Sequence, residues 1–381
     1  MVYLDYNAST PVDQRVLAAY VEATELFANP SSAHHMAGQA AADVVEGARF
    51  QVARLMNRPT QDVVFTSGAT EAATIGLLGA MLGAPSRPNV VVSATEHKAI
   101  IAAAELGARL TGGTVRWAPV DRRGLVDLAY LRDAIDDSVS VVAVMAANNE
   151  TGVVAPVTEV SVTARHAGAL TFVDVTQLLG KAPLEQAMDA ADIAICSSHK
   201  IYGPKGAGAL IASRSVQKAM VPIQSGGGQE RGLRGGTQNT PAIAGFGLAA
   251  EIVEGEAAGD AVRIGHLSDE LLTLLSADLP GIRLNGEGAE RLSNTLNLHF
   301  PGADAEAVMA SMPVLQVSSG SACQSAAPTP SHVLVAMGVT AAQADECLRI
   351  SLGRPTTYSE VKIAAEAIIE AVSRVRTMTA A

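Results

Sequence analysis

Short apolar runs alternate with longer helical patterns over the first two-thirds of the 381 residues. The predicted strands cover 62–66, 89–93, 140–145, 171–174 and 192–196, and the helices between them cover 69–82, 98–109 and 157–166. Strands that are apolar throughout are typical of sheets buried on both faces. This order predicts an α/β fold with a mainly parallel sheet between two layers of helices. In such a sheet, ligands bind beyond the carboxyl ends of the strands.

A second, smaller domain is expected from the length of the chain. At ~150 residues per domain, 381 residues correspond to about two and a half domains. The composition changes at 251–259, which is rich in Glu, Ala and Gly, and further helical patterns cover 264–275 and 359–377. We therefore expect a large domain over 14–255 and a small domain formed by 1–13 and 256–381.

Composition and charge exclude several classes of protein. Hydrophobic residues make up 48% and charged residues 17%, which excludes a disordered chain. A net charge of −11 disfavours direct binding to nucleic acid or to an anionic membrane. Three cysteines are too few for a disulfide scaffold and suit a reducing compartment. The N-terminus lacks a signal-peptide pattern, so we expect a cytoplasmic protein, with no membrane span and no metal site.

The first candidate binding element is the turn Thr66-Ser67-Gly68-Ala69-Thr70-Glu71, between a predicted strand and a predicted helix. The free N–H groups of this helix start, together with the Thr70 hydroxyl, would hold a phosphate. The alternative is an ordinary capped helix start with Glu71 in the first turn.

Lys200 is the candidate nucleophile, in the segment Cys196-Ser197-Ser198-His199-Lys200-Ile201-Tyr202-Gly203-Pro204-Lys205-Gly206. It follows a buried strand, where desolvation removes charge from a lysine and lets it form a Schiff base. Ser197 and His199 could bind a phosphate or hold the lysine. The alternative is a polar loop with two solvated lysines.

Other polar side chains follow the ends of the predicted strands. Asp174 could pair with a cationic ring nitrogen, with Gln177 three residues further on, or it could cap a following helix. His97 could stack on a flat cofactor and move protons, or it could be structural. The cluster 148–152 is either part of the site or a plain turn.

The Gly-rich loop 226–237 carries Arg231 and Arg234. These arginines could clamp an anion or reach a neighbouring subunit. The alternative is a mobile surface loop.

The three cysteines lie in different settings. Cys323 lies in the small, polar segment 318–327, where a reactive thiolate would be placed, although a tolerated loop cysteine is the alternative. Cys196 lies in an apolar strand and Cys347 in an amphipathic helical stretch, and both are expected in the core.

Taken together, these motifs resemble the NifS/IscS-type cysteine desulfurases, in the same order and over nearly the whole chain. The matching segments are 4–11, 29–32, 67–71, 95–98, 148–150, 174–177, 198–206, 231–237, 319–323 and 349–354. The family belongs to the class V aminotransferases among the fold-type I pyridoxal phosphate (PLP) enzymes. The resemblance implies a three-layer α/β/α large domain, a smaller α+β domain and a homodimer.

The resemblance also implies which residues hold PLP. Lys200 would carry the cofactor, Asp174 would pair with its pyridinium nitrogen, and Gln177 would bind its ring hydroxyl. His97 would stack on the ring and serve in proton transfer. The phosphate would be held by Ala69, Thr70, Ser197 and His199, with Thr237 reaching in from the partner subunit.

For the substrate, the resemblance implies L-cysteine, which is converted to L-alanine. Asn149 and Arg349 would hold the carboxylate of the substrate, and Asn149 would also lie beside the cofactor. Cys323 would attack the substrate sulfur and carry it as a persulfide to an acceptor protein.

The sequence departs from the housekeeping members of this family in two places. Position 324 is Gln where those members usually have Thr, and the chain ends without the longer tail with which they dock an iron–sulfur scaffold. The similarity would also suit the DndA desulfurase of DNA-phosphorothioation systems. The negative charge then implies delivery of sulfur through protein partners.

The alternatives are a selenocysteine lyase or small-molecule aminotransferase of the same fold, and a non-catalytic scaffold that binds PLP.

Overall fold

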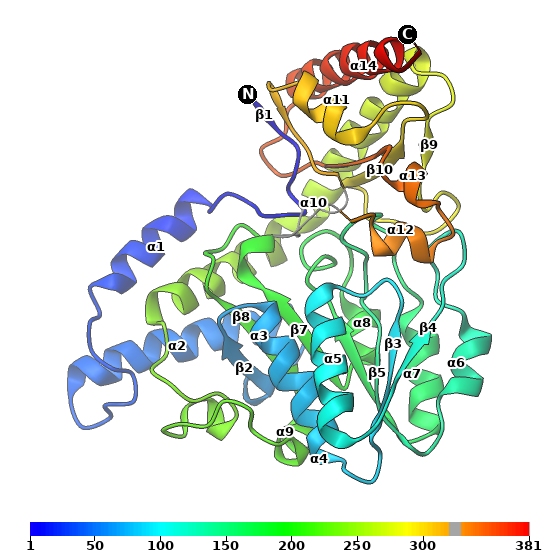
Figure 1. The fold of residues 1–381 in the computed structure, drawn as a ribbon. Helices are drawn as coiled ribbons and strands as arrows, with labels where there is room; N and C mark the ends of the chain where they lie inside the picture. The colour runs from blue at the N-terminus through cyan, green and yellow to red at the C-terminus, as the bar shows by residue number, and fades with distance from the viewer. Residues whose placement is uncertain (320–328, 381) are drawn as a thin grey trace.

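A seven-stranded sheet forms the centre of the protein in the computed structural model, which describes residues 1–319 and 329–380 (Figure 1). The strand order is β2-β8-β7-β6-β5-β3-β4. The bounds are Val63–Thr66 (β2), Asn89–Ser93 (β3), Val115–Ala118 (β4), Val139–Ala143 (β5), Leu170–Asp174 (β6), Ile193–Ser197 (β7) and Gly208–Ala212 (β8). Only β8 runs antiparallel to its neighbours. The prediction of a mainly parallel sheet is therefore confirmed.

Helices cover both faces of this sheet because successive side chains of a strand point to opposite faces. In β3, Val90 and Val92 belong to one core and Val91 to the other. The first core includes α3 (Ala69–Ala73), α4 (Gly79–Gly83), α5 (Lys98–Thr111) and α9 (Arg214–Ala219), with the π-helical turn Thr74–Leu78 between α3 and α4. The second includes α2 (Met36–Leu55), α6 (Leu128–Ala134), α7 (Val157–His166), α8 (Glu185–Ala190) and the first half of α10 (Thr240–Asp278).

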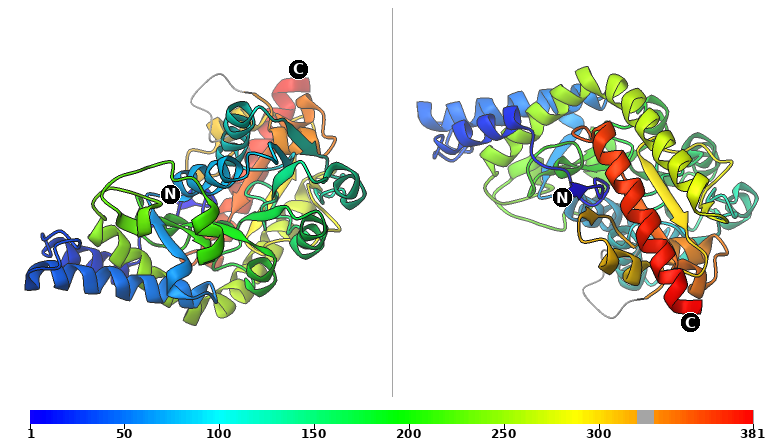
Figure 2. Two further views of the ribbon diagram at one scale, coloured as in Figure 1. Left: turned by 90° about the horizontal axis from the view of Figure 1, so that it is seen from below. Right: turned by 90° about the horizontal axis from the view of Figure 1, so that it is seen from above.

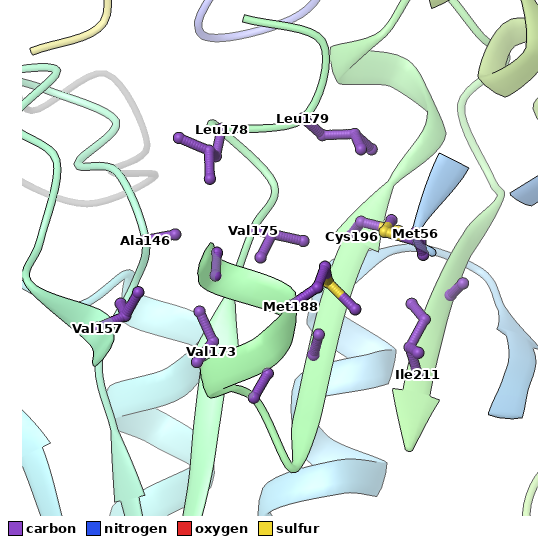
Figure 3. Close-up of a cluster of buried hydrophobic side chains, with 14 of the residues drawn as sticks. Met56, Ala146, Val157, Val173, Val175, Leu178, Leu179, Met188, Cys196 and Ile211 are labelled. Carbon is purple, nitrogen blue, oxygen red and sulfur yellow. The ribbon is translucent and has the colours of Figure 1, made fainter. Parts of the chain in front are cut away.

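Figure 3 shows part of the second core, with Cys196 drawn among apolar side chains that include Met56 and Met188. Cys196 is fully buried in β7, as predicted. Burial raises the pKa of its thiol far above the ordinary value. This cysteine therefore has the environment of a core residue.

A smaller part of the chain, with its own hydrophobic core, lies beyond the carboxyl ends of the sheet (Figures 1 and 2). The second half of α10 enters it, and both ends of the described chain lie there. It has a three-stranded antiparallel sheet in the order β12-β10-β9, and a parallel pair of β1 with β11. The elements are β1 (Val2–Tyr3), β9 (Arg283–Leu284), β10 (Thr295–His299), α11 (Ala305–Ser311), β11 (Leu315–Gln316), β12 (Cys347–Ser351) and α14 (Tyr358–Ala380).

The remaining helices are α1 (Gln14–Thr24), which packs against α10, and the short α12 (His332–Ala336) and α13 (Ala341–Ala344). The 3-10 turns are Thr60–Asp62, Ser198–Lys200 and Gln229–Gly232. Within the described residues, no helix combines the length and the apolar composition needed to cross a membrane.

The composition change at 251–259 lies inside the continuous helix α10. The division at 255 stays a prediction. Cys347 is not in a helix but is the first residue of β12, where pairing with His299 of β10 decides its conformation. It is fully buried, as expected.

A buried ion pair joins α2 to the loop 226–237. The side chains of Arg49 and Glu230 are 4% and 1% exposed. Arg49 donates two hydrogen bonds of 2.7 and 2.9 Å to the Glu230 carboxylate, which also accepts the Phe65 N–H at 3.0 Å. The carboxylate therefore ties the loop to β2.

Replacing Arg49 with Ala should lower the free energy of unfolding by about 3–5 kcal/mol, because it leaves the Glu230 carboxylate buried without its cation. The matched control is Arg54→Ala, also on α2, whose partner Glu254 is 37% exposed. That change should cost only about 0–1 kcal/mol. Urea denaturation measures both values, and equal losses would contradict the assignment.

Candidate active site

One cavity of about 410 Å³ collects most of the predicted site residues at the carboxyl ends of the parallel strands. Ten of them line it: Ala69, Thr70, His97, Asn149, Asp174, Gln177, Ser197, His199, Lys200 and Arg349. Thr237 is exposed and absent from the lining, and Cys323 lies outside the described residues. These side chains are up to 280 residues apart in the sequence, from Ala69 to Arg349, and Arg349 comes from β12 of the smaller part.

The start of α3 offers unpaired N–H groups to this cavity. Gly68 is the residue before the helix, and no side chain in the described part of the chain caps the helix there. The first-turn N–H groups of Ala69 and Thr70 have no partner within the helix. Glu71 instead accepts the Ser67 N–H and pairs with Arg234 at 2.9 Å. The helix start is therefore open to an anion.

Lys200 follows β7 in a short 3-10 turn, and its Nζ points to the N-terminal segment of the chain. Nζ donates to the carbonyl oxygens of Asn7 at 2.5 Å and Ala8 at 2.7 Å. Both of these residues also line the cavity. No sequence motif predicts a role for Asn7, which is 193 residues from Lys200 in the chain.

His97 caps a helix and also lines the cavity. Its Nδ1 accepts the Ala99 N–H at 3.2 Å and so caps α5, while the ring lines the cavity. Burial lowers the pKa of His97; the charge of Asp174 opposes this effect and that of Lys200 adds to it. A neutral ring with Nδ1 as acceptor carries its proton on Nε2.

Asp174 ends β6 and does not cap a helix. Its Oδ1 accepts the Thr176 N–H at 2.8 Å within a turn, and α8 begins only at Glu185. Since Asp174 lines the cavity, its second oxygen is the one left for a ligand.

His199 lies beside Lys200, with Nδ1 3.2 Å from the Ser9 hydroxyl. Burial and the charges of Lys200 and Lys205 lower the pKa of His199 to about 4. The imidazole is therefore neutral at pH 7 and offers hydrogen bonds without a charge.

Arg349 of β12 forms the far wall with Asn149. It pairs with Asp5 at 2.6 Å and donates to the Asn149 carbonyl at 3.1 Å. Its buried Nε has no hydrogen-bond partner in the described part of the chain. A guanidinium with an open donor beside the cavity is suited to a carboxylate.

Both arginines of the loop 226–237 bind their own chain. Arg231 donates to Gln217 and to the Val63 carbonyl, and Arg234 pairs with Glu71. The expectation that they clamp an anion is therefore not supported, and the loop is anchored.

Two buried carboxyl groups, for which no sequence motif predicts a role, lie next to the site. Burial, and then the charge of Asp174, raise the pKa of Glu96 to about 8. Burial raises the pKa of Glu150 to about 7, although Ser331 and Arg349 act in the opposite direction. In the sequence, the only feature that pointed to Glu96 and Glu150 was that they adjoin the candidate residues His97 and Asn149.

Glu96 should make the protein less stable as the pH rises. Its folded-state pKa is above the ordinary value of 4.5, so between pH 4.5 and 8 the folded state binds the proton more tightly than the unfolded state. The stability is complete below pH 4.5 and decreases by up to about 4 kcal/mol toward pH 8. Glu96→Gln should remove this slope.

The measurement is the free energy of unfolding against pH for the wild type and for Glu96→Gln. Glu105→Gln, on an exposed position of α5, is the control and should follow the wild type. Parallel curves for the wild type and Glu96→Gln would show that Glu96 is not the group that titrates.

The chain matches the class V aminotransferase family over residues 2–363 and belongs to that family. It is 47% identical to a cysteine desulfurase of Frankia sp. (strain EuIK1), with 100% of this chain and 93% of that protein covered. A solved NifS-like protein is 33% identical, with a TM-score of 0.89 and coverage of 98% and 99%. DndA from Streptomyces lividans is also 33% identical, with a TM-score of 0.77 and coverage of 90% and 97%.

Enzymes of this family depend on PLP, and the residues of the cavity fit that cofactor. Its volume lies within the ~300–1,000 Å³ of small-molecule sites. The open start of α3 suits a phosphate, and Asp174 suits a cationic ring nitrogen. Thr176 Oγ1, in the cavity wall, is buried without a partner in the described residues. The chain is therefore a PLP-dependent enzyme of the class V aminotransferases.

Proposed function

We propose that the enzyme is a cysteine desulfurase that converts L-cysteine to L-alanine and leaves the sulfur on Cys323. The main support for this proposal is that Lys200, Asp174 and the open start of α3 all line one cavity. The name of the Frankia relative supports cysteine as the substrate. Arg349 Nε and Asn149 would orient the substrate carboxylate.

PLP, when bound to Lys200, supplies an electron sink that lets the substrate lose its α-proton. Asp174 would hold a proton on the ring nitrogen and so keep the ring cationic. Lys200 Nζ would take the proton from the substrate Cα. Ala69, Thr70, Ser197 and His199 would hold the phosphate, and His97 would cover the ring.

The sulfur step requires a thiolate, and Cys323 is our proposed nucleophile. Its Sγ bonds to the substrate sulfur while the bond from that sulfur to Cβ breaks. The electron pair stays with the three-carbon product, which takes up a proton and leaves as alanine. Atoms and electrons balance without an outside oxidant, because sulfur passes to Cys323 as a persulfide.

The test is turnover of cysteine by the purified protein with PLP. Alanine should form, and tryptic peptide masses should show the extra sulfur on Cys323. Cys323→Ser should bind PLP but yield no alanine, whereas Cys196→Ser and Cys347→Ser should retain activity. Sulfur on Cys347, or full activity of Cys323→Ser, would overturn the role of Cys323.

The same assay separates the alternative functions. PLP binding without alanine formation would favour a scaffold, and turnover only of selenocysteine would favour a lyase.

We further propose that the active unit is a cytoplasmic homodimer. Thr237 is exposed and is not among the residues that line the cavity of its own chain, which suits a residue that completes the partner's phosphate site. Light scattering at low micromolar concentration should give twice the chain mass of 39.1 kDa. A fully active monomer would contradict this proposal.

The sulfur acceptor is proposed to be a protein of a thio-modification or iron–sulfur pathway. The likeness to DndA of Streptomyces lividans supports DNA phosphorothioation as one such pathway. The net charge of −11 favours protein-to-protein delivery over direct binding to DNA.

A further inference from the structure

We propose that Lys181 is a positioning residue that fixes the side-chain amide of Gln177, so that this amide offers the cavity an N–H donor. The inference rests on the proposed function, because the acceptor it would meet is the ring oxygen of PLP. Lys181 is not among the residues that line the cavity, and no sequence motif predicts a role for it.

The side chains concerned form a closed set of hydrogen bonds. Lys181 Nζ donates to Gln177 Oε1 at 2.5 Å and lies 3.3 Å from Asn7 Oδ1. Gln177 Nε2 donates to the Asn7 carbonyl oxygen at 3.0 Å. Lys200 Nζ donates to the same carbonyl oxygen. Lys181 therefore acts on two residues that contact the cavity directly.

The chemistry of these partners determines which way the Gln177 amide points. The Asn7 carbonyl can only accept, so the nitrogen of the amide must face it. The amine of Lys181 donates, so the amide oxygen must face the amine. One N–H of Nε2 remains, and Gln177 lines the cavity. This N–H is therefore the group left for a ligand, and an oxygen there would repel an anionic ring oxygen.

The environment of Lys181 is unusual for a lysine. It lies in the turn between β6 and α8, and its hydrogen-bond partners among the described residues are the uncharged side chains of Gln177 and Asn7. Burial lowers the pKa of Lys181 well below its ordinary value, and the charges of Lys200 and Arg349 act in the same direction. The amine donates to both of the acceptors that it meets, Gln177 Oε1 and Asn7 Oδ1.

Two further bonds make this arrangement rigid. Asn294 Nδ2 donates to Asn7 Oδ1 at 3.0 Å, and Asn7 Nδ2 donates to Thr295 Oγ1 at 2.9 Å. Asn7 is 1% exposed, so its amide has no freedom to turn toward water. Removal of Lys181 would therefore leave Gln177 Oε1 without its hydrogen-bond partner.

The test compares Lys181→Met with the wild type by titration of PLP into the apo-protein. Lys181→Met keeps the length of the side chain but removes its donors. We expect the PLP dissociation constant to rise about tenfold, as for loss of one hydrogen bond to a charged group. The visible absorption maximum of bound PLP should also shift. Lys218→Met, on an exposed position of α9, is the matched control and should leave both readouts unchanged.

A double-mutant cycle separates positioning from a merely structural role. In a Gln177→Ala background, Lys181→Met should have no further effect on the spectrum or on PLP affinity. Additive effects, or an unchanged spectrum and affinity for Lys181→Met alone, would overturn the inference.

A second variant covers the case in which Lys181→Met does not fold. Gln177→Glu keeps the acceptor for Lys181 but has no N–H for the cavity, so it should weaken PLP binding by a similar factor. Unchanged binding by Gln177→Glu would also overturn the inference. A wild type that binds PLP but makes no alanine would overturn the proposed function instead, and the PLP titrations would still decide the role of Lys181.

Discussion

Lys200→Ala should abolish alanine formation from cysteine, with a loss of at least about 10⁴-fold in turnover. The variant loses both the covalent attachment of PLP and the amine that takes the α-proton. The remaining cavity residues still offer hydrogen bonds, so PLP should bind only loosely and be lost on gel filtration. The visible absorbance of the protein before and after filtration measures this difference from the wild type.

Borohydride reduction of the wild type with PLP identifies the lysine independently of activity. Peptide mapping should find the reduced cofactor on Lys200 alone. The nearby amines are Lys205, which lines the same cavity, and Lys181, which is bound to Gln177. Label on either of them would show that the assignment of Lys200 is wrong.

Asp174→Ala should lower turnover by about 10²-fold or more while changing the unfolding free energy far less. The carboxylate would stabilise the cationic ring through a charge-assisted hydrogen bond in a site with little water. Its structural contribution is one hydrogen bond to the Thr176 N–H, worth about 1–2 kcal/mol. Alanine production and urea denaturation of the same preparation measure the two effects.

Asp192→Ala is the matched control for this experiment. Asp192 also accepts a backbone N–H, that of Thr171, at 2.8 Å, but at the opposite end of β6 from Asp174. It should lose a similar amount of stability and keep its turnover. If Asp174→Ala retained near-normal alanine production, Asp174 would have only the structural role that Asp192 has.

Local patterns in the sequence were sufficient for most of the large sheet. Five apolar runs predicted β2, β3, β5, β6 and β7 to within one or two residues at each end. Two strands were missed. β4 is at the edge of the sheet, with Trp117 40% exposed, so its pattern is not that of a buried strand. β8 begins at Gly208, directly after a Gly/Pro turn, and only its antiparallel pairing with β2 and β7 makes it a strand.

The rule that ligands bind beyond the carboxyl ends of parallel strands also predicted where most of the candidate site lies. Asp174 ends one predicted strand, His97 and Lys200 follow two others, and all three residues line the cavity. The roles of these residues came from the resemblance to a family. The sequence alone left open whether His97 is structural or contacts a cofactor, and in the structure its ring caps α5 and lines the cavity.

The sequence by itself determined the α/β architecture and the edge of the sheet where the site lies, because hydrophobic periodicity is a local property of the chain. Only the tertiary structure decided that Cys347 is in a strand, that 251–259 continues a helix, and that Asp5 pairs with Arg349. It also brought Asn7 to Lys181, across 174 residues of sequence. Such contacts depend on how the smaller part packs over the sheet, and no local pattern records that packing.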